Sequence, residues 1–128
     1  VGLWGFGAIQ GLLSSGLLPD AKYNLSFWAR VINNANGAIT HFNASSDNIG
    51  YLIFAGGEGA LPQFDNPLTS LPPSLVQLAT IKINNDQQWN HYSMPITVTS
   101  TAQLNYISVY NAGWMVSPDS SNFILIDD

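Results

Sequence analysis

The stretch YNLSFWARV, residues 23–31, alternates apolar and polar side chains and therefore predicts a β-strand. Successive side chains of a strand point to opposite faces of its sheet, so Phe27 and Trp28 must face opposite ways. The apolar face holds Tyr23, Leu25, Phe27, Ala29 and Val31, and the polar face holds Asn24, Ser26, Trp28 and Arg30. We expect Phe27 in the core. Trp28 is expected either on a binding surface or beneath a neighbouring chain.

The rest of the sequence also favours short strands. Glycine and proline recur, and no window longer than about ten residues keeps a helical period. The expected strands are residues 7–13, 23–32, 38–43, 50–54, 76–83, 91–99, 103–110 and 122–126. The connection at residues 55–74 contains four prolines and is long enough to form an ordered lid or ridge. Eight short strands predict an all-β fold, an antiparallel β-sandwich.

Composition limits the classes of protein and partner. The 128 residues suit one domain, and only 9% are charged against about 25% in an average soluble domain. Asn, Ser, Thr and Gln fill the polar positions, which is typical of secreted β-proteins and favours a secreted, cell-surface or virion-surface location. A net charge of −5 argues against nucleic acid as a partner. The absence of cysteine excludes disulfides, thiol catalysis and Cys-ligated zinc.

The apolar first segment, VGLWGFGAIQGLLSSGLL, does not predict a signal peptide or membrane insertion. It lacks a basic residue, contains five glycines and is interrupted by Gln10, Ser14 and Ser15. The chain begins without methionine and ends on FILIDD, within an expected strand. We therefore expect a single domain over residues 1–128 that belongs to a longer chain.

Four segments carry a resemblance to a known group of proteins. GLLPDAKYNLSFWARV, residues 16–31, resembles the L-x-P-G-x-x-Y-x-L-S-F-W-x-K strand of jelly-roll carbohydrate-binding modules of the family 4, 9 and 22 type. QWNHYSMPITV, LNYISVYNAG and FILIDD resemble later strands of that group, in the same order. The resemblance implies a jelly-roll sandwich. It also implies an earlier N-G-x-F-E strand, which is expected to be missing or supplied by another segment.

The resemblance suggests where a glycan would bind. Sugar recognition uses an aromatic face for the C–H side of a pyranose and polar groups for its hydroxyls. The implied aromatic residues are Trp28, Tyr106 and Tyr110, with Arg30 and Asn24 as polar partners. The alternative is that these rings cover the sandwich edge or pack under the long loop.

Other candidates lie at the ends of the expected strands. A large ring in a loop makes Trp114 a further ligand-binding candidate, whereas the counterpart of Trp89 in the group generally packs at the core edge. The resemblance also implies that Asp127 and Asp128 bind a structural calcium ion, for which carboxylates are suitable ligands. A solvated chain end is the alternative for these two residues.

Catalytic motifs are not evident. Glu58 is the only glutamate, and a glycosidase needs two carboxylates about 5–10 Å apart. Asp65 becomes its partner only if the long loop folds back. His41 and His91 have no G-x-S-x-G or H-E-x-x-H neighbours. We therefore do not expect an enzyme, and an enzyme domain that uses Glu58 is the least favoured interpretation.

The sequence is compatible with two functions, one in ligand binding and one in structural assembly. The first is a non-catalytic carbohydrate-binding module that attaches a larger extracellular protein to polysaccharide or another glycan. The alternative is a structural jelly-roll subunit or decoration domain of a virion, fibre or surface filament, with strands exchanged between protomers in a homo-oligomer. The surroundings of Trp28 are expected to discriminate between them.

Overall fold

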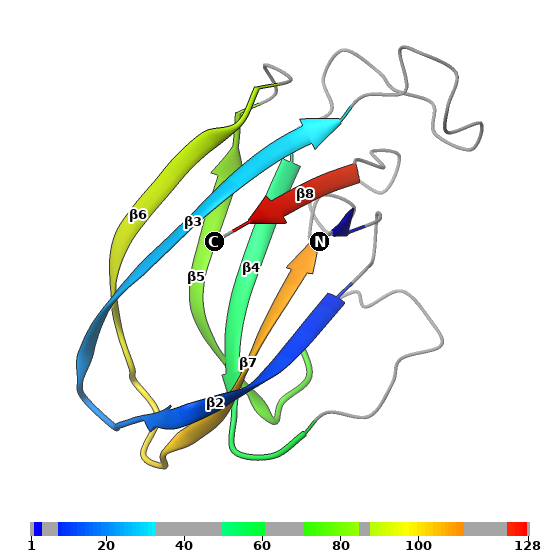
Figure 1. Ribbon diagram of the computed structural model, residues 1–128. Coiled ribbons are helices and arrows are strands. Elements are labelled where there is room, and N and C mark those ends of the chain that lie inside the picture. Colours follow the sequence, from blue (N-terminus) through cyan, green and yellow to red (C-terminus); the bar gives the residue numbers. More distant parts are fainter. Residues whose placement is uncertain are drawn as a thin grey trace.

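The protein is an all-β sandwich of two antiparallel sheets (Figure 1). The computed structural model describes residues 2–3, 8–32, 50–60, 71–84, 88–111 and 123–127. The strands are β1 (Gly2–Leu3), β2 (Ala8–Leu17), β3 (Lys22–Ile32), β4 (Gly50–Gly57), β5 (Leu75–Ile83), β6 (Asn90–Thr97), β7 (Leu104–Asn111) and β8 (Phe123–Asp127). The antiparallel sandwich predicted from the sequence is confirmed.

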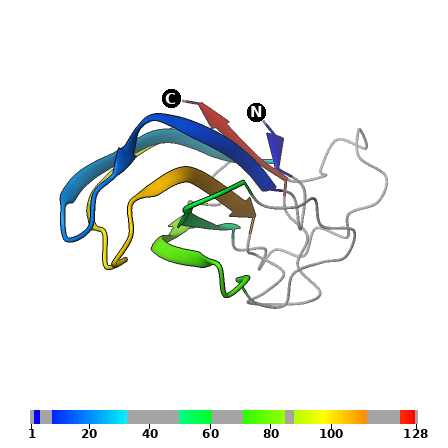
Figure 2. The ribbon, with the colours of Figure 1, turned by 90° about the horizontal axis from the view of Figure 1, so that it is seen from below.

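The strands divide into two sheets of four. Sheet A has the order β1-β8-β3-β6 and sheet B has the order β2-β7-β4-β5. Figure 2, seen from below, shows β3 of sheet A in one layer and β4 and β5 of sheet B in the other. The ladders pair β1 with β8, β2 with β7, β3 with β6 and β4 with β5. Two more ladders, β3 with β8 and β4 with β7, complete the sheets.

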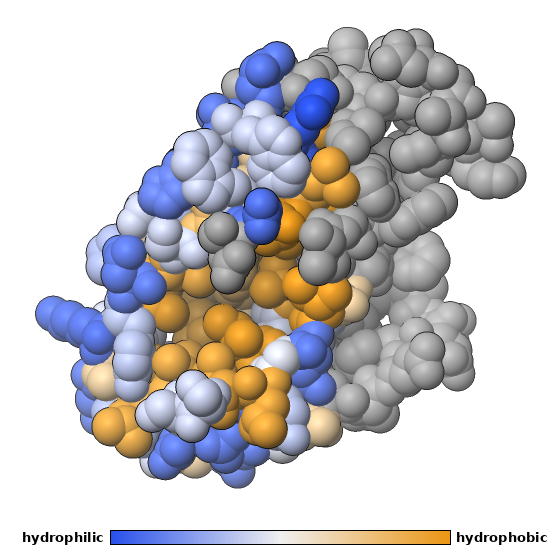
Figure 3. All heavy atoms as spheres, in the orientation of Figure 1, coloured by the Kyte–Doolittle hydropathy of each residue, from blue (hydrophilic) through white to orange (hydrophobic). Residues whose placement is uncertain are grey.

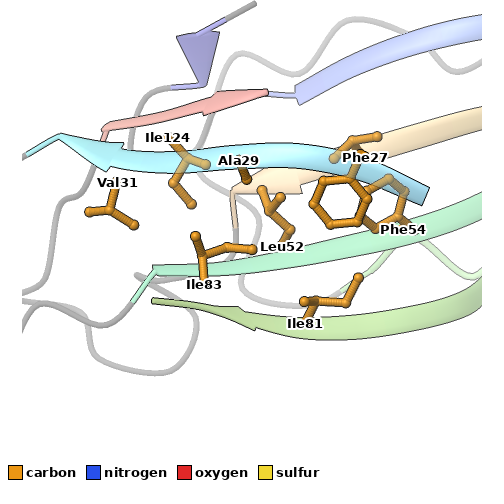
Figure 4. Close-up of a cluster of buried hydrophobic side chains, with 9 residues drawn as sticks. Phe27, Ala29, Val31, Leu52, Phe54, Ile81, Ile83 and Ile124 are labelled. Atoms are coloured by element: carbon orange, nitrogen blue, oxygen red, sulfur yellow. The ribbon is translucent and has the colours of Figure 1, made fainter. Parts of the chain in front are cut away.

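The main core fills the space between the sheets. Figure 4 shows side chains of β3 and β8 facing those of β4 and β5. The buried members are Phe27, Ala29, Val31, Leu52, Phe54, Ile81, Ile83, Val109 and Ile124. The Phe27 ring centroid lies 4.9 Å from that of Phe54 and 5.4 Å from that of Tyr92. Phe27 is only 4% exposed, which confirms the core position predicted by alternation.

A second apolar cluster covers the opposite face of sheet B. Ile53, Ala55, Leu75 and Tyr110 are buried together, and Tyr51 and Leu71 pack against them. Because Leu52 and Phe54 face the main core, β4 is buried on both of its faces. Such strands are continuously apolar instead of alternating, which explains the run LIFA at residues 52–55.

Several element boundaries differ from those expected. β2 continues to Leu17, although Ser14, Ser15 and Gly16 are residues that favour turns. Its register with β7 shifts between Leu12, opposite Tyr106, and Leu17, opposite Leu104, so an irregularity of the ladder accommodates these residues within the strand. β4 likewise extends to Gly57, which shortens the connection expected at residues 55–74. The strand expected at residues 38–43 lies outside the described residues.

The turn between β2 and β3 connects the two sheets. Asp20 adopts a φ of 60°, a left-handed conformation that aspartate tolerates better than most residues. Its backbone N–H donates to the Val98 carbonyl at 2.8 Å, and the Val98 N–H donates to the Ala21 carbonyl at 3.0 Å. The chain thereby enters β3 beside the end of β6. Across the described ranges, helices long and apolar enough to span a membrane are not found.

Candidate functional site

The outer face of sheet A, which points away from the main core, presents Trp28 at the centre of three strands. Trp28 of β3 lies opposite His91 of β6 on one side and opposite Asp127 of β8 on the other. Trp28 is 44% exposed, and both neighbours are exposed as well. The alternation of YNLSFWARV therefore places the indole on an accessible surface, flanked by an imidazole and a carboxylate.

Hydrogen bonds organise the polar side chains beside the indole. The Ser26 Oγ and the His91 Nε2 are 2.8 Å apart, and the His91 ring centroid lies 5.1 Å from that of Trp28. One step further along the ladder, the Asn24 Nδ2 donates to the Ser93 Oγ at 3.0 Å. These cross-strand contacts fix the polar groups in a row parallel to β3. The row offers hydroxyl, amide and imidazole groups at the edge of an aromatic surface.

Arg30 is the next outward-facing residue along β3, opposite Leu125 of β8. It is the only arginine in the sequence and is half-buried. Its Nε is buried and has no hydrogen-bond partner within the described part of the chain. A buried, unsatisfied guanidinium nitrogen costs free energy unless a ligand or water completes its bonding. Arg30 therefore places a half-buried guanidinium on the same face of β3 as Trp28.

Trp89 was expected to pack at the edge of the core, but its side chain is exposed. It precedes β6 by one residue and is 42% exposed. The register pairs Ala29 with Asn90, so the next positions along the two chains are Arg30 and Trp89. Trp89 shares the parity of the outward-facing His91 in the sequence. The two-residue spacing between Trp89 and His91 is the sequence signal that could have identified Trp89 as an outward-facing candidate.

The two predicted tyrosines lie on the other sheet. Tyr106 and Tyr110 belong to β7 of sheet B, whereas Trp28 belongs to sheet A. Tyr110 is 2% exposed within the second apolar cluster, and Tyr106 is half-buried between Leu12 and Gly57. The expectation that these rings form one binding surface with Trp28 is therefore corrected. The cause is the apolar cluster on the outer face of sheet B, where Leu71 packs against residues of the strands.

Burial also changes the acidity of Tyr110. Removal from water raises the pKa of its phenol, and a hydrogen bond with the Ser108 side chain acts in the opposite direction. A neutral, buried phenol is typical of a packed aromatic residue, and it is not accessible to a glycan. Tyr110 therefore contributes to the stability of sheet B and does not form part of a binding surface.

Only some of the remaining candidate residues lie within the described part of the chain. Trp114 and Asp128 lie outside the described residues, as do His41 and Asp65. Asp127 is exposed at the end of β8, and the described residues contain no cluster of three or more His, Asp or Glu side chains suited to a metal ion. The calcium site stays a prediction. Glu58 is exposed just after β4, and its backbone carbonyl accepts a hydrogen bond from the Asn105 side chain at 3.1 Å.

The outer face of sheet A thus combines the exposed Trp28 with polar side chains held by cross-strand hydrogen bonds, and a second exposed tryptophan, Trp89, immediately precedes β6. Such a surface is suited to stacking and hydrogen bonding with a polar ligand that has apolar faces. Comparison with known proteins finds no family model, curated protein or solved structure that matches the chain.

Proposed function

We propose that this chain is a non-catalytic carbohydrate-binding module whose glycan site is the outer face of sheet A. The observation that carries the proposal is the exposed Trp28, with Ser26 and His91 hydrogen-bonded beside it. An indole supplies a flat apolar surface for the C–H face of a pyranose, and the neighbouring hydroxyls and imidazole bond the sugar hydroxyls.

Arg30 and Trp89 would extend the site along the end of β3. Arg30 would contribute its half-buried guanidinium, and Trp89 would contribute a second exposed ring. Asn24 would define the opposite end, through its contact with Ser93. A site of this length suits a chain of sugars, so polysaccharide should bind more tightly than a monosaccharide. The row excludes Tyr106 and Tyr110.

A jelly-roll connection of the sandwich is part of this proposal. The pairing of β1 with β8, β2 with β7, β3 with β6 and β4 with β5 is what a long antiparallel ribbon produces when it folds into two sheets. The proposed setting is a secreted or surface-attached protein. The low fraction of charged residues and the absence of cysteine are compatible with that setting.

The test is binding of the 128-residue chain to a glycan array, followed by affinity measurements with the polysaccharides that bind. Trp28→Ala should weaken binding at least about tenfold, because central aromatic residues commonly contribute more than 1 kcal/mol to recognition. Lys82→Ala is the control, since Lys82 is exposed on β5 of sheet B. Absence of any glycan signal, or an unchanged affinity of Trp28→Ala, would contradict the proposal.

A structural role in a larger assembly is the second candidate function. The exposed, uncharged β2 at one edge of sheet B is the observation that favours it. Association without glycan binding would support this role over the first.

A further inference from the structure

The edge of sheet B formed by β2 is open to another strand. β2 is the last strand in its sheet and pairs with β7 through residues 8–12 and Leu17. Among the described strands, nothing pairs with its other side. None of its ten residues is buried. Its outward backbone N–H and C=O groups therefore form a template for an additional strand.

The other sheet edges carry a proline, an exposed lysine or a very short strand, each of which discourages strand addition, and β2 carries none of these three features. β6 contains Pro95, which lacks a backbone N–H, β5 contains the exposed Lys82, and β1 has only two residues. β2 contains neither proline nor a charged residue. Its register with β7 shifts between Leu12 and Leu17. The contrast singles out one edge of the four as suited to pairing.

This edge also exposes large apolar side chains. Leu12 is 69% exposed and Leu18, just after the strand, is 54% exposed, the highest values among the large hydrophobic side chains that the structure describes. Figure 3 shows apolar residues around a hollow between β3 and β2. Exposed apolar surface beside an unpaired strand edge is typical of an interaction site. The observations therefore point to a protein partner that contributes a strand.

The sequence of β2 is compatible with antiparallel pairing to β2 of a second copy. About the bond between Ser14 and Ser15 of GLLSSGLL, residues 11–18, the two halves match at Leu12 with Leu17 and at Ser14 with Ser15, and they differ at Leu13 with Gly16 and at Gly11 with Leu18. In an antiparallel pairing about that point, Leu12 lies opposite Leu17, Ser14 opposite Ser15, and Leu13 opposite Gly16. Every opposing pair is apolar, small or hydroxylic. A two-fold dimer requires this self-complementarity, because the same surface serves both subunits.

Charge favours a second copy over an acidic or basic partner. The chain has a net charge of −5, so two copies repel each other through most surfaces. Neither β2 nor the adjacent β7 contains a charged residue. Two copies can therefore approach through this edge without opposing like charges directly across the interface.

We propose that two copies of this chain dimerise by antiparallel pairing of β2 with β2, so that two four-stranded sheets become one continuous eight-stranded sheet. The interface lies on sheet B and leaves the outer face of sheet A free. The dimer is thus independent of glycan binding, and each Trp28 stays accessible within it.

The test is the mass of the 128-residue chain by analytical ultracentrifugation from low to high micromolar concentration. The wild-type chain should dimerise reversibly. Leu12→Lys should raise the dimer dissociation constant at least about tenfold, because it places a cation opposite Leu17 of the other copy. Thr99→Lys is the matched control, since Thr99 is exposed and follows β6. It should dimerise like the wild type.

A second variant addresses the backbone. Ser15→Pro removes one N–H and should also weaken the dimer, while hydrogen exchange should show slower exchange at residues 13–16 in the wild-type dimer than in the Leu12→Lys monomer. A wild-type chain that stays monomeric throughout the concentration range would overturn the proposal. So would a dimer that Leu12→Lys leaves intact. Glycan binding is measured on the Leu12→Lys monomer as well, so that failure of the dimer and failure of the proposed glycan binding can be told apart.

Discussion

Trp28 and His91 lie directly opposite each other on β3 and β6, with their ring centroids 5.1 Å apart and an interplanar angle of 52°. The Nε2 of the same imidazole lies 2.8 Å from the Ser26 Oγ. His91 is therefore held by an aromatic ring on one side and a hydroxyl on the other. Cross-strand contacts of this kind fix side-chain orientation at modest energetic gain.

Ser26 and His91 should stabilise the fold as a coupled pair. A double-mutant cycle of Ser26→Ala and His91→Ala should give a coupling free energy of about 0.5–1 kcal/mol at neutral pH. The measurement is urea unfolding of the wild-type chain, the two single variants and the double variant. Strictly additive losses would show that the hydrogen bond does not form in solution.

Phe27 and Trp28 should differ sharply in their contribution to stability. Phe27→Ala leaves a cavity between the sheets and should lower the free energy of unfolding by about 3–5 kcal/mol. Trp28→Ala should lower it by only about 1–2 kcal/mol, because the indole is partly covered. Chemical denaturation of both variants measures the difference. A greater loss for Trp28→Ala would mean that Trp28, not Phe27, faces the core.

Tyr110 should make stability depend on pH in the alkaline range. Burial raises the pKa of its phenol above the ordinary value of 10.0, so the unfolded chain releases this proton at a lower pH than the folded one. The contribution of Tyr110 to stability is therefore complete below about pH 10 and declines as pH rises through the folded-state pKa. Comparison of unfolding free energies of the wild type and Tyr110→Phe from pH 8 to 11 isolates this dependence. Parallel curves would contradict the burial of the phenol.

Gly56 should not tolerate a side chain. A Cβ at this position would lie 2.5 Å from the Leu104 Cδ1 and 3.3 Å from the Leu104 Cβ. Leu104 is 1% exposed and has little room to move, so Gly56→Ala should cost about 1–3 kcal/mol. Gly11→Ala is the control, because nothing lies within 4 Å of its added Cβ. Equal stability of the two variants would refute the close packing at Leu104.

Alternation was sufficient to predict both faces of β3 from the sequence. Phe27 lies in the core and Trp28 on the surface, because that strand has one buried and one exposed face. The same rule failed for β7, where residues 108–111 are all buried. A period of two shows which side chains share a face, and it does not show what covers that face. The covering of Tyr110 depends on contacts distant in sequence.

The candidate site could be predicted only in part for a similar reason. Asn24, Trp28 and Arg30 share a strand, so their common face follows from local sequence. Trp89 joins them through the register of β3 with β6, which depends on the pairing of residues far apart in the chain. The extension of β2 through Ser14–Gly16 was missed because turn-favouring residues are accommodated there by an irregularity in the ladder with β7.

The strict division of β3 between an inner and an outer set of side chains has an evolutionary consequence. Its inward residues hold the sandwich together, while among the described strands its outward residues lie opposite residues of β6 and β8. If this face binds glycan as proposed, substitutions in the outward set would alter ligand preference while leaving the packing between the sheets intact. This strand would allow specificity to diverge without loss of the scaffold, and it is the natural position at which to begin redesigning what the protein recognises.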